Sequence, residues 1–193
     1  MSLSMNSVFI TGISTAGKST LAGKLAAEFG IRHVNNDHLR GEMVKDPALE
    51  PWANFYHNKN EAAYYATTSF DQCWQDLVLQ SEAIWPTMKR KMKEIAAVNQ
   101  AVIFEGVNLL PHLMNELPFK GIVMLGSSKQ EIFERLKNEP RWGSTEELQR
   151  LEAVETFDQV RRYLVEAEKY CYPTFGEPHA AEDELRKLIQ QSA

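Results

Sequence analysis

The segment with the most specific chemical pattern is Gly12-Ile13-Ser14-Thr15-Ala16-Gly17-Lys18-Ser19-Thr20. It fits G-x-x-x-x-G-K-[ST], the phosphate-binding loop, without a mismatch. Glycines at both ends let the backbone turn tightly, so its N–H groups and the N-terminus of the next helix can surround a phosphate. Lys18 would reach the β- and γ-phosphates, and the Ser19 hydroxyl would ligate Mg²⁺. An ordinary glycine turn would not explain a lysine at a helix N-terminus, so the segment predicts a bound nucleotide.

Three more charged residues follow expected strands. Asp37 could orient or deprotonate an acceptor hydroxyl, and Arg40 could bind an anionic group of that acceptor. Glu105 would point into the crevice at the carboxyl edge of a parallel sheet, where it could hold Mg²⁺ through water or position the acceptor. The alternatives are a helix cap for Asp37, a solvated charge for Arg40 and an exposed strand-end carboxylate for Glu105.

Phosphoryl transfer also needs cations around the migrating charge and exclusion of water, and a mobile lid often supplies both. The charged helical region 128–165 would form such a lid, and the candidate arginines in it are Arg135, Arg141, Arg161 and Arg162. Arg141 is the preferred catalytic arginine, because a Pro-Arg-Trp-Gly sequence interrupts the helical pattern there, and Arg135 is the second lid candidate. The alternative for each arginine is a solvated helix face.

The elements that must position these residues follow from the apolar pattern. Short apolar runs predict strands at 8–10, 31–34, 101–104 and 121–125. Helical spacing predicts helices at 19–29, 61–85, 89–97, 128–136, 145–169 and 180–191, with an irregular stretch at 47–59. Pro86 should kink a helix or begin a new one. Buried strands separated by helices predict a parallel sheet covered on both faces.

Composition limits the class of protein. The chain has 193 residues, 44% apolar and 24% charged, which predicts one domain over 1–193, with 1–7 as a tag remnant or disordered start. No apolar run is long enough to span a membrane, and no secretory signal opens the chain. A net charge of -5 disfavours a general nucleic-acid binder. Two cysteines form no disulfide framework and no zinc cluster, so we expect a cytoplasmic protein.

The absence of several motifs excludes some classes of nucleotide-binding protein. The chain has no Asn-Lys-x-Asp string for guanine, no D-x-x-G switch and no Leu-Ser-Gly-Gly transporter signature, and it is too short for most ring ATPases. A compact kinase with a small-molecule phosphoryl acceptor is therefore the leading hypothesis. Two alternatives stay open: a nucleotide-dependent regulatory module without an acceptor, and a kinase acting on a nucleoside, a sugar nucleotide or a nucleic-acid end. The sequence does not predict the oligomeric state.

Three segments together resemble 2-phosphoglycerate kinases and their P-loop kinase relatives. They are the phosphate loop, the stretch from Ile31-Arg32 to Asn36-Asp37-His38-Leu39-Arg40, and Glu105-Gly106-Val107-Asn108-Leu109-Leu110-Pro111. The resemblance covers residues 8–111, just over half of the chain. The family tends to have His where Asn108 stands, and the nearby imidazole here belongs to His112.

This resemblance implies a three-layer α/β/α P-loop NTPase fold with a mainly parallel five-stranded sheet of the adenylate-kinase type and a helical lid region. It implies ATP and Mg²⁺ as cofactors, and a small phosphorylated or carboxylated hydroxy compound as acceptor. Lys18 and Ser19 would bind ATP and Mg²⁺, Asp37 and Arg40 would belong to the acceptor site, and Glu105 would face the crevice. A fifth strand is not evident in the sequence before residue 180.

Overall fold

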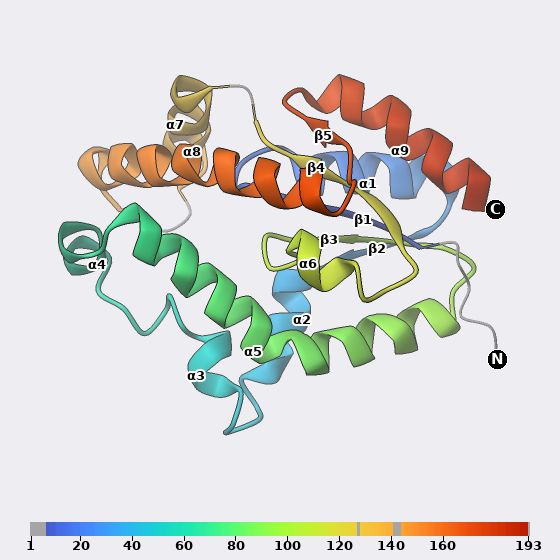
Figure 1. Ribbon diagram of the computed structural model, residues 1–193, viewed down its shortest axis with the longest axis horizontal. Helices are drawn as coiled ribbons and strands as arrows, with labels where there is room; N and C mark the ends of the chain where they lie inside the picture. Colours follow the sequence, from blue (N-terminus) through green and yellow to red (C-terminus); the bar gives the residue numbers. More distant parts are fainter. Residues whose placement is uncertain (1–6, 127, 141–143, 193) are drawn as a thin grey trace.

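The computed structural model describes residues 7–126, 128–140 and 144–192 (Figure 1). Within them, the strands are β1 (Val8–Gly12), β2 (Arg32–Asn35), β3 (Val102–Glu105), β4 (Lys120–Met124) and β5 (Thr174–Phe175). The longer helices are α1 (Lys18–Phe29), α2 (Asn36–Met43), α5 (Phe70–Ala97), α7 (Lys129–Asn138), α8 (Glu146–Lys169) and α9 (Pro178–Ser192). The shorter helices are α3 (Glu50–Ala53), α4 (Glu61–Thr67) and α6 (Pro111–Met114).

Over the described residues, the strands form one five-stranded sheet in the order β2-β3-β1-β4-β5, and each neighbouring pair is parallel. This confirms the predicted parallel sheet and the α/β class. β5 was not evident in the sequence because it has only two residues, too few for a periodic pattern. It is held to β4 by the Val123 amide, which donates to Pro173, and the Leu125 amide, which donates to Phe175.

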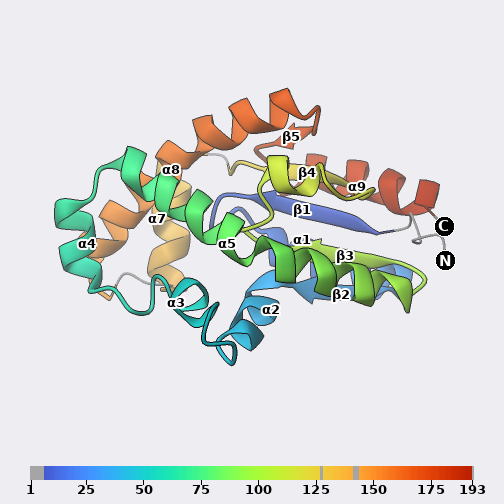
Figure 2. The same ribbon diagram turned by 60° about the horizontal axis from the view of Figure 1, so that its bottom comes forward.

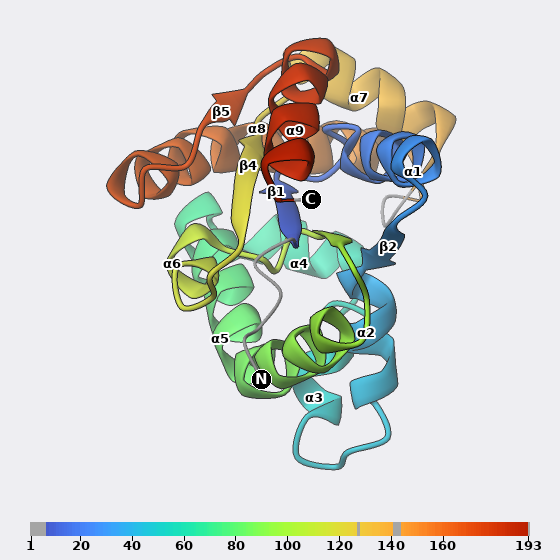
Figure 3. The same cartoon turned by 90° about the vertical axis from the view of Figure 1, so that its right-hand side faces the viewer.

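Helices cover both faces of the sheet, which makes three layers. α1 and α9 pack on one face, while α5, α6 and α8 pack on the other (Figure 3). β1 is the central strand, and all five of its residues are buried. Because all strands are parallel, the loops after β1, β2 and β3 leave the sheet at one edge. None of the helices in the described ranges is long and apolar enough to span a membrane.

The predicted helix over 61–85 is interrupted in the structure. α4 ends at Thr67, and the Ser69 side chain caps α5 by accepting a hydrogen bond from the Gln72 amide at 3.2 Å. α5 then continues through Pro86 as one helix and bends near its middle (Figure 1), as expected where proline removes a backbone donor. The chain also forms the short helix α3 inside the stretch 47–59 that was predicted to be irregular.

Gly121 allows β4 to pack directly against β1. A Cβ at residue 121 would lie 2.3 Å from a ring carbon of Phe9, which is fully buried. Gly121→Ala should therefore lower the free energy of unfolding by about 1–3 kcal/mol through overpacking. Gly41→Ala is the matched control, because an added Cβ there meets nothing within 4 Å and the residue lies in α2.

Urea unfolding followed by tryptophan fluorescence measures both variants. We expect a lower midpoint for Gly121→Ala and an unchanged or higher midpoint for Gly41→Ala. Equal midpoints for the two variants would contradict the close contact between β1 and β4.

Candidate active site

The phosphate loop joins β1 to α1 in a conformation that its sequence allows. Gly12, Thr15 and Gly17 have positive φ angles of 123°, 61° and 86°. A Cβ at Gly12 would lie 1.9 Å from the carbonyl oxygen of Met124 in β4. The Ile13 amide donates to that same carbonyl at 3.1 Å, so the loop is tied to the neighbouring strand. The backbone N–H groups of such a turn form a concave nest suited to an anion.

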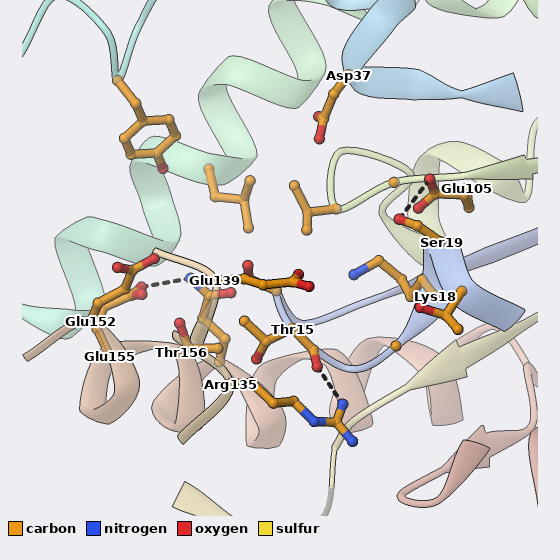
Figure 4. A pocket seen from close by; sticks show the side chains of 18 of the residues that line it. Thr15, Lys18, Ser19, Asp37, Glu105, Arg135, Glu139, Glu152, Glu155 and Thr156 are labelled. Carbon is orange, nitrogen blue, oxygen red and sulfur yellow. Dashed lines mark hydrogen bonds between the residues drawn. The ribbon is translucent and has the colours of Figure 1, made fainter. Parts of the chain in front are cut away.

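Lys18 lies at the start of α1, and its side chain is 93% buried. Its ammonium donates to the carbonyl of Ile13 at 2.5 Å, which folds the side chain back over its own loop. Figure 4 shows the ammonium directed toward the open space in front of the loop. The loop residues Ser14, Thr15, Gly17, Lys18, Ser19 and Thr20 line that space, whereas Gly12, Ile13 and Ala16 shape the backbone behind it.

Glu105 ends β3 and is almost fully buried beside α1. Ser19 Oγ donates to Glu105 Oε1 at 3.0 Å, and His33 Nε2 on β2 lies 3.5 Å from the same oxygen. Burial raises the pKa of Glu105, but the hydrogen bond from His33, the Lys18 charge and the Ser19 hydroxyl together bring the pKa below its ordinary value. The alternative of an exposed strand-end carboxylate is therefore wrong. An ionised carboxylate stands beside a hydroxyl, and these oxygen donors suit Mg²⁺.

α2 places Asp37 and Arg40 on the cavity wall. Asn35, and not Asp37, caps this helix, since its side chain accepts from the Asp37 amide at 2.7 Å. The Asp37 carboxylate lies 3.2 Å from Arg40 and is partly exposed to the cavity. Arg40 also donates to Asn108 Oδ1 at 2.7 Å, so its guanidinium is held rather than solvated.

His112, the imidazole closest in sequence to Asn108, does not line the cavity. His112 is on α6, where its ring nitrogens face Glu166 on α8 and Glu82 on α5. The hydrogen bond to Glu166 raises the pKa of His112, and burial opposes that rise. The Asn108 side chain, at the position where the family tends to have His, binds Arg40. Its amide is fixed by hydrogen bonds to the buried side chains of Ser81 and Gln80.

Among the arginines of region 128–165, Arg135 reaches the phosphate loop. Its guanidinium on α7 donates to the carbonyl of Thr15 at 2.5 Å and pairs with Glu131. Arg161 and Arg162 instead pair with Asp158 and with Asp71 at the start of α5, away from the cavity lining. Arg141 lies outside the described residues, so its catalytic role stays a prediction.

The phosphate loop, Asp37, Arg40, Glu105 and Arg135 face one cavity of about 720 Å³. This volume is large enough for a nucleotide and a small acceptor. The phosphate loop, α2 and the end of β3 form one side, while α4, α7 and the first half of α8 form the other. Figures 1 and 2 both show α4, α7 and the start of α8 gathered at the same end of the molecule. In the described part of region 128–165, α7 and the first half of α8 line the cavity, and a lid role stays a prediction.

The residues of the cavity wall opposite the phosphate loop were not predicted from the sequence. Four residues of α8 line it, namely Glu152, Glu155, Thr156 and Gln159, together with tyrosines 56, 64 and 65. The spacing on α8 places its four residues on one helix face. This polar face was the signal in the sequence for a cavity wall. Its pattern is the same as that of a solvent-exposed helix surface, however. Only the packing of α4 against α8 shows that it is enclosed.

Glu155 is a buried carboxyl of this wall whose pKa is raised. Burial raises its pKa to about 7, and the charges of Glu152 and Asp158 add to the rise. A hydrogen bond from the Gln159 amide at 2.6 Å and the charge of Arg162 oppose it. The side chain is therefore partly protonated near neutral pH.

This raised pKa predicts a pH effect on stability. The folded state binds the proton of Glu155 more tightly than the unfolded chain does, so its stability should fall as the pH rises from 4.5 to about 7. Glu155→Gln mimics the protonated carboxyl and removes this dependence. We expect the wild type to lose about 1–3 kcal/mol relative to Glu155→Gln across that range. Urea unfolding at a series of pH values measures it, and parallel profiles for the two proteins would contradict it.

No protein-family model matches the chain, and no curated protein matches its sequence. Several solved structures are similar to it in fold. Shikimate kinase from Acinetobacter baumannii in complex with shikimate gives a TM-score of 0.52 at 15% identity, covering 96% of this chain and 93% of that one. Deoxyadenosine kinase from M. mycoides with bound dATP gives 0.52 at 16% identity, covering 95% and 98%. An uncharacterized protein from Eubacterium ventriosum gives 0.50 at 15% identity, covering 96% and 98%. The chain therefore has the α/β fold of these two kinases.

Proposed function

We propose that the protein is an ATP-dependent kinase that transfers the γ-phosphoryl group to a hydroxyl of a small metabolite. The observation that carries this proposal is that the phosphate loop lines the same cavity as Asp37 and Arg40. A nucleotide-binding switch needs the loop, but it does not need an acidic and a basic side chain enclosed with it. Two structures of the same fold are named as kinases, which supports the proposal.

The phosphate loop would bind the triphosphate of ATP. Its backbone N–H groups and Lys18 neutralise the phosphate charges, and Arg135 lies beside the loop, where it could add a further cation. Ser19 and Glu105 would hold Mg²⁺, since they offer a hydroxyl and an ionised carboxylate side by side. Bound Mg²⁺ supplies positive charge to the transferring phosphoryl group.

Asp37 and Arg40 would handle the acceptor. Asp37 would accept the hydroxyl proton as the oxygen attacks phosphorus, and Arg40 would bind an anionic group of the acceptor. The resemblance to 2-phosphoglycerate kinases favours a phosphorylated or carboxylated hydroxy acid. α7 and α8 would exclude water from the transfer, which limits hydrolysis of ATP. The cytoplasmic location and the single domain stay predictions.

Lys18→Ala tests the loop. We expect at least a hundredfold loss of phosphoryl transfer, because the lysine charge stabilises the migrating group. Transfer of γ-labelled phosphate from ATP to a panel of hydroxy acids, nucleosides and sugars measures the loss. Lys93→Ala is the control, since Lys93 lies on α5 outside the cavity lining and should keep full activity. Unchanged transfer in Lys18→Ala would overturn the proposed function, and label released only to water would favour a regulatory NTPase.

Asp37→Asn tests the proposed base. We expect kcat to fall by about 10²–10⁴-fold with little change in ATP affinity, because proton transfer is lost while the phosphate loop is intact. Steady-state kinetics and nucleotide titration separate the two effects. A variant with normal kcat and raised KM for the acceptor would show that Asp37 only binds substrate.

A further inference from the structure

We propose that Asn108 is a positioning residue of the acceptor site, which holds the Arg40 guanidinium at the cavity wall for the anionic group of the acceptor. This inference rests on the proposed function, because it concerns how the same site binds its acceptor. Asn108 is 4% exposed and does not line the cavity, whereas Arg40 does. Asn108 therefore acts on the acceptor through Arg40 and not by direct contact.

The direction of each hydrogen bond around Asn108 follows from the chemistry of its partners. A guanidinium only donates, so the 2.7 Å contact with Arg40 uses the carbonyl oxygen of the Asn108 side chain as acceptor. The amide nitrogen has two N–H donors, which face Gln80 Oε1 at 3.1 Å and Ser81 Oγ at 2.8 Å. Turning the amide over would place these N–H groups against the donors of Arg40, so its orientation is fixed.

The two partners of the amide nitrogen are anchored in turn to backbone carbonyls. Gln80 Nε2 donates to the carbonyl of Trp52 in α3 at 2.9 Å. Ser81 Oγ donates to the carbonyl of Leu77 in α5 at 2.7 Å. Gln80 and Ser81 are each 1% exposed, so water has little access to these bonds. Two helices thereby fix the position of the side-chain oxygen that binds the arginine.

The backbone of the loop that carries Asn108 is held as well. Thr11 Oγ1 in the central strand donates to the carbonyl of Gly106 at 3.1 Å. Tyr163 of α8 donates to the carbonyl of Val107 at 2.7 Å. A side chain held at this point is fixed relative to the sheet, and so relative to the phosphate loop that follows β1.

The bond to Asn108 also keeps Arg40 from pairing more closely with Asp37. The same nitrogen, Arg40 Nη1, lies 2.7 Å from the Asn108 oxygen and 3.2 Å from the Asp37 carboxylate. An amide oxygen directs the guanidinium without cancelling its charge, so the positive charge can still attract an anion. A closer pair of Arg40 and Asp37 would instead engage both groups that the proposed reaction uses.

Nitrogen-15 NMR of the free protein tests whether Asn108 holds Arg40. Exchange between the two Nη nitrogens reports rotation of the guanidinium, and Arg40→Lys assigns the signals. We expect this rotation to be at least about tenfold faster in Asn108→Ala than in the wild type, because a hydrogen bond to a charged group is lost. Ser81→Ala leaves the contact with Arg40 but removes one support of Asn108, so the rotation should become about two- to threefold faster.

Steady-state phosphoryl transfer from ATP to an acceptor found in the compound panel tests the role in binding. Asn108→Ala should raise the KM for that acceptor about tenfold, with kcat within about twofold and an unchanged KM for ATP, because the arginine it orients binds substrate. Asn99→Ala is the matched control. The Asn99 side chain also donates to a carbonyl of α5, that of Ile95 at 2.7 Å, but it lies outside the cavity lining, so the KM should not change.

Equal rotation rates in the wild type and Asn108→Ala would overturn the inference. A loss of kcat with an unchanged acceptor KM, or the same rise in KM in Asn99→Ala, would overturn it too. Urea unfolding shows whether each variant is folded, and if Asn108→Ala is not, Ser81→Ala decides by the same two measurements. If no compound of the panel accepts phosphate from ATP, the proposed function fails, while the rotation rates still show whether Asn108 holds Arg40.

Discussion

A methyl group at residue 12 would come within 1.9 Å of the Met124 carbonyl oxygen, and the chain can leave β1 as it does only because that residue is glycine. The same carbonyl accepts the Ile13 amide, so the loop is fixed to β4 at the point where it turns. That anchor sets the start of α1, and with it the positions of Lys18 and Ser19. The rest of the site is arranged around this loop, since a phosphate-binding nest loses its geometry if its first residue moves.

The two walls of the cavity differ in their groups. Backbone amides, Lys18 and Arg40 lie with Glu105 and Asp37 near the strand ends, whereas Glu152, Glu155 and phenol rings line the wall opposite. Arg40 belongs to a polar network, in which Asn108 accepts from the guanidinium and is itself held by Ser81. Such a network fixes the direction of a long side chain before a ligand arrives, which reduces the entropy lost on binding.

The sequence predicted what depends on local pattern. Nine consecutive residues predicted the phosphate loop. Buried strands that alternate with helices predicted the parallel sheet. The prediction failed where tertiary packing decides: β5 is too short for a pattern, and Thr68 ends a helix whose apolar spacing continues. The sequence of the acidic face of α8 has the same pattern as a solvent-exposed helix face. Nothing in the neighbouring residues shows that α4 packs over it.

Helix α8 serves two purposes at its two ends. Its second half is anchored in the interior, where Tyr163 is fully buried and donates to the carbonyl of Val107 at 2.7 Å, while its first half forms the acidic wall. The residues proposed for the reaction come from the phosphate loop, α2 and the end of β3, whereas α4 and α8 shape the opposite wall of the cavity. Substitutions on these two helices could therefore redirect such a protein to new compounds while its reactive core is inherited unchanged. That separation also makes the first half of α8 the natural place to begin an engineering effort.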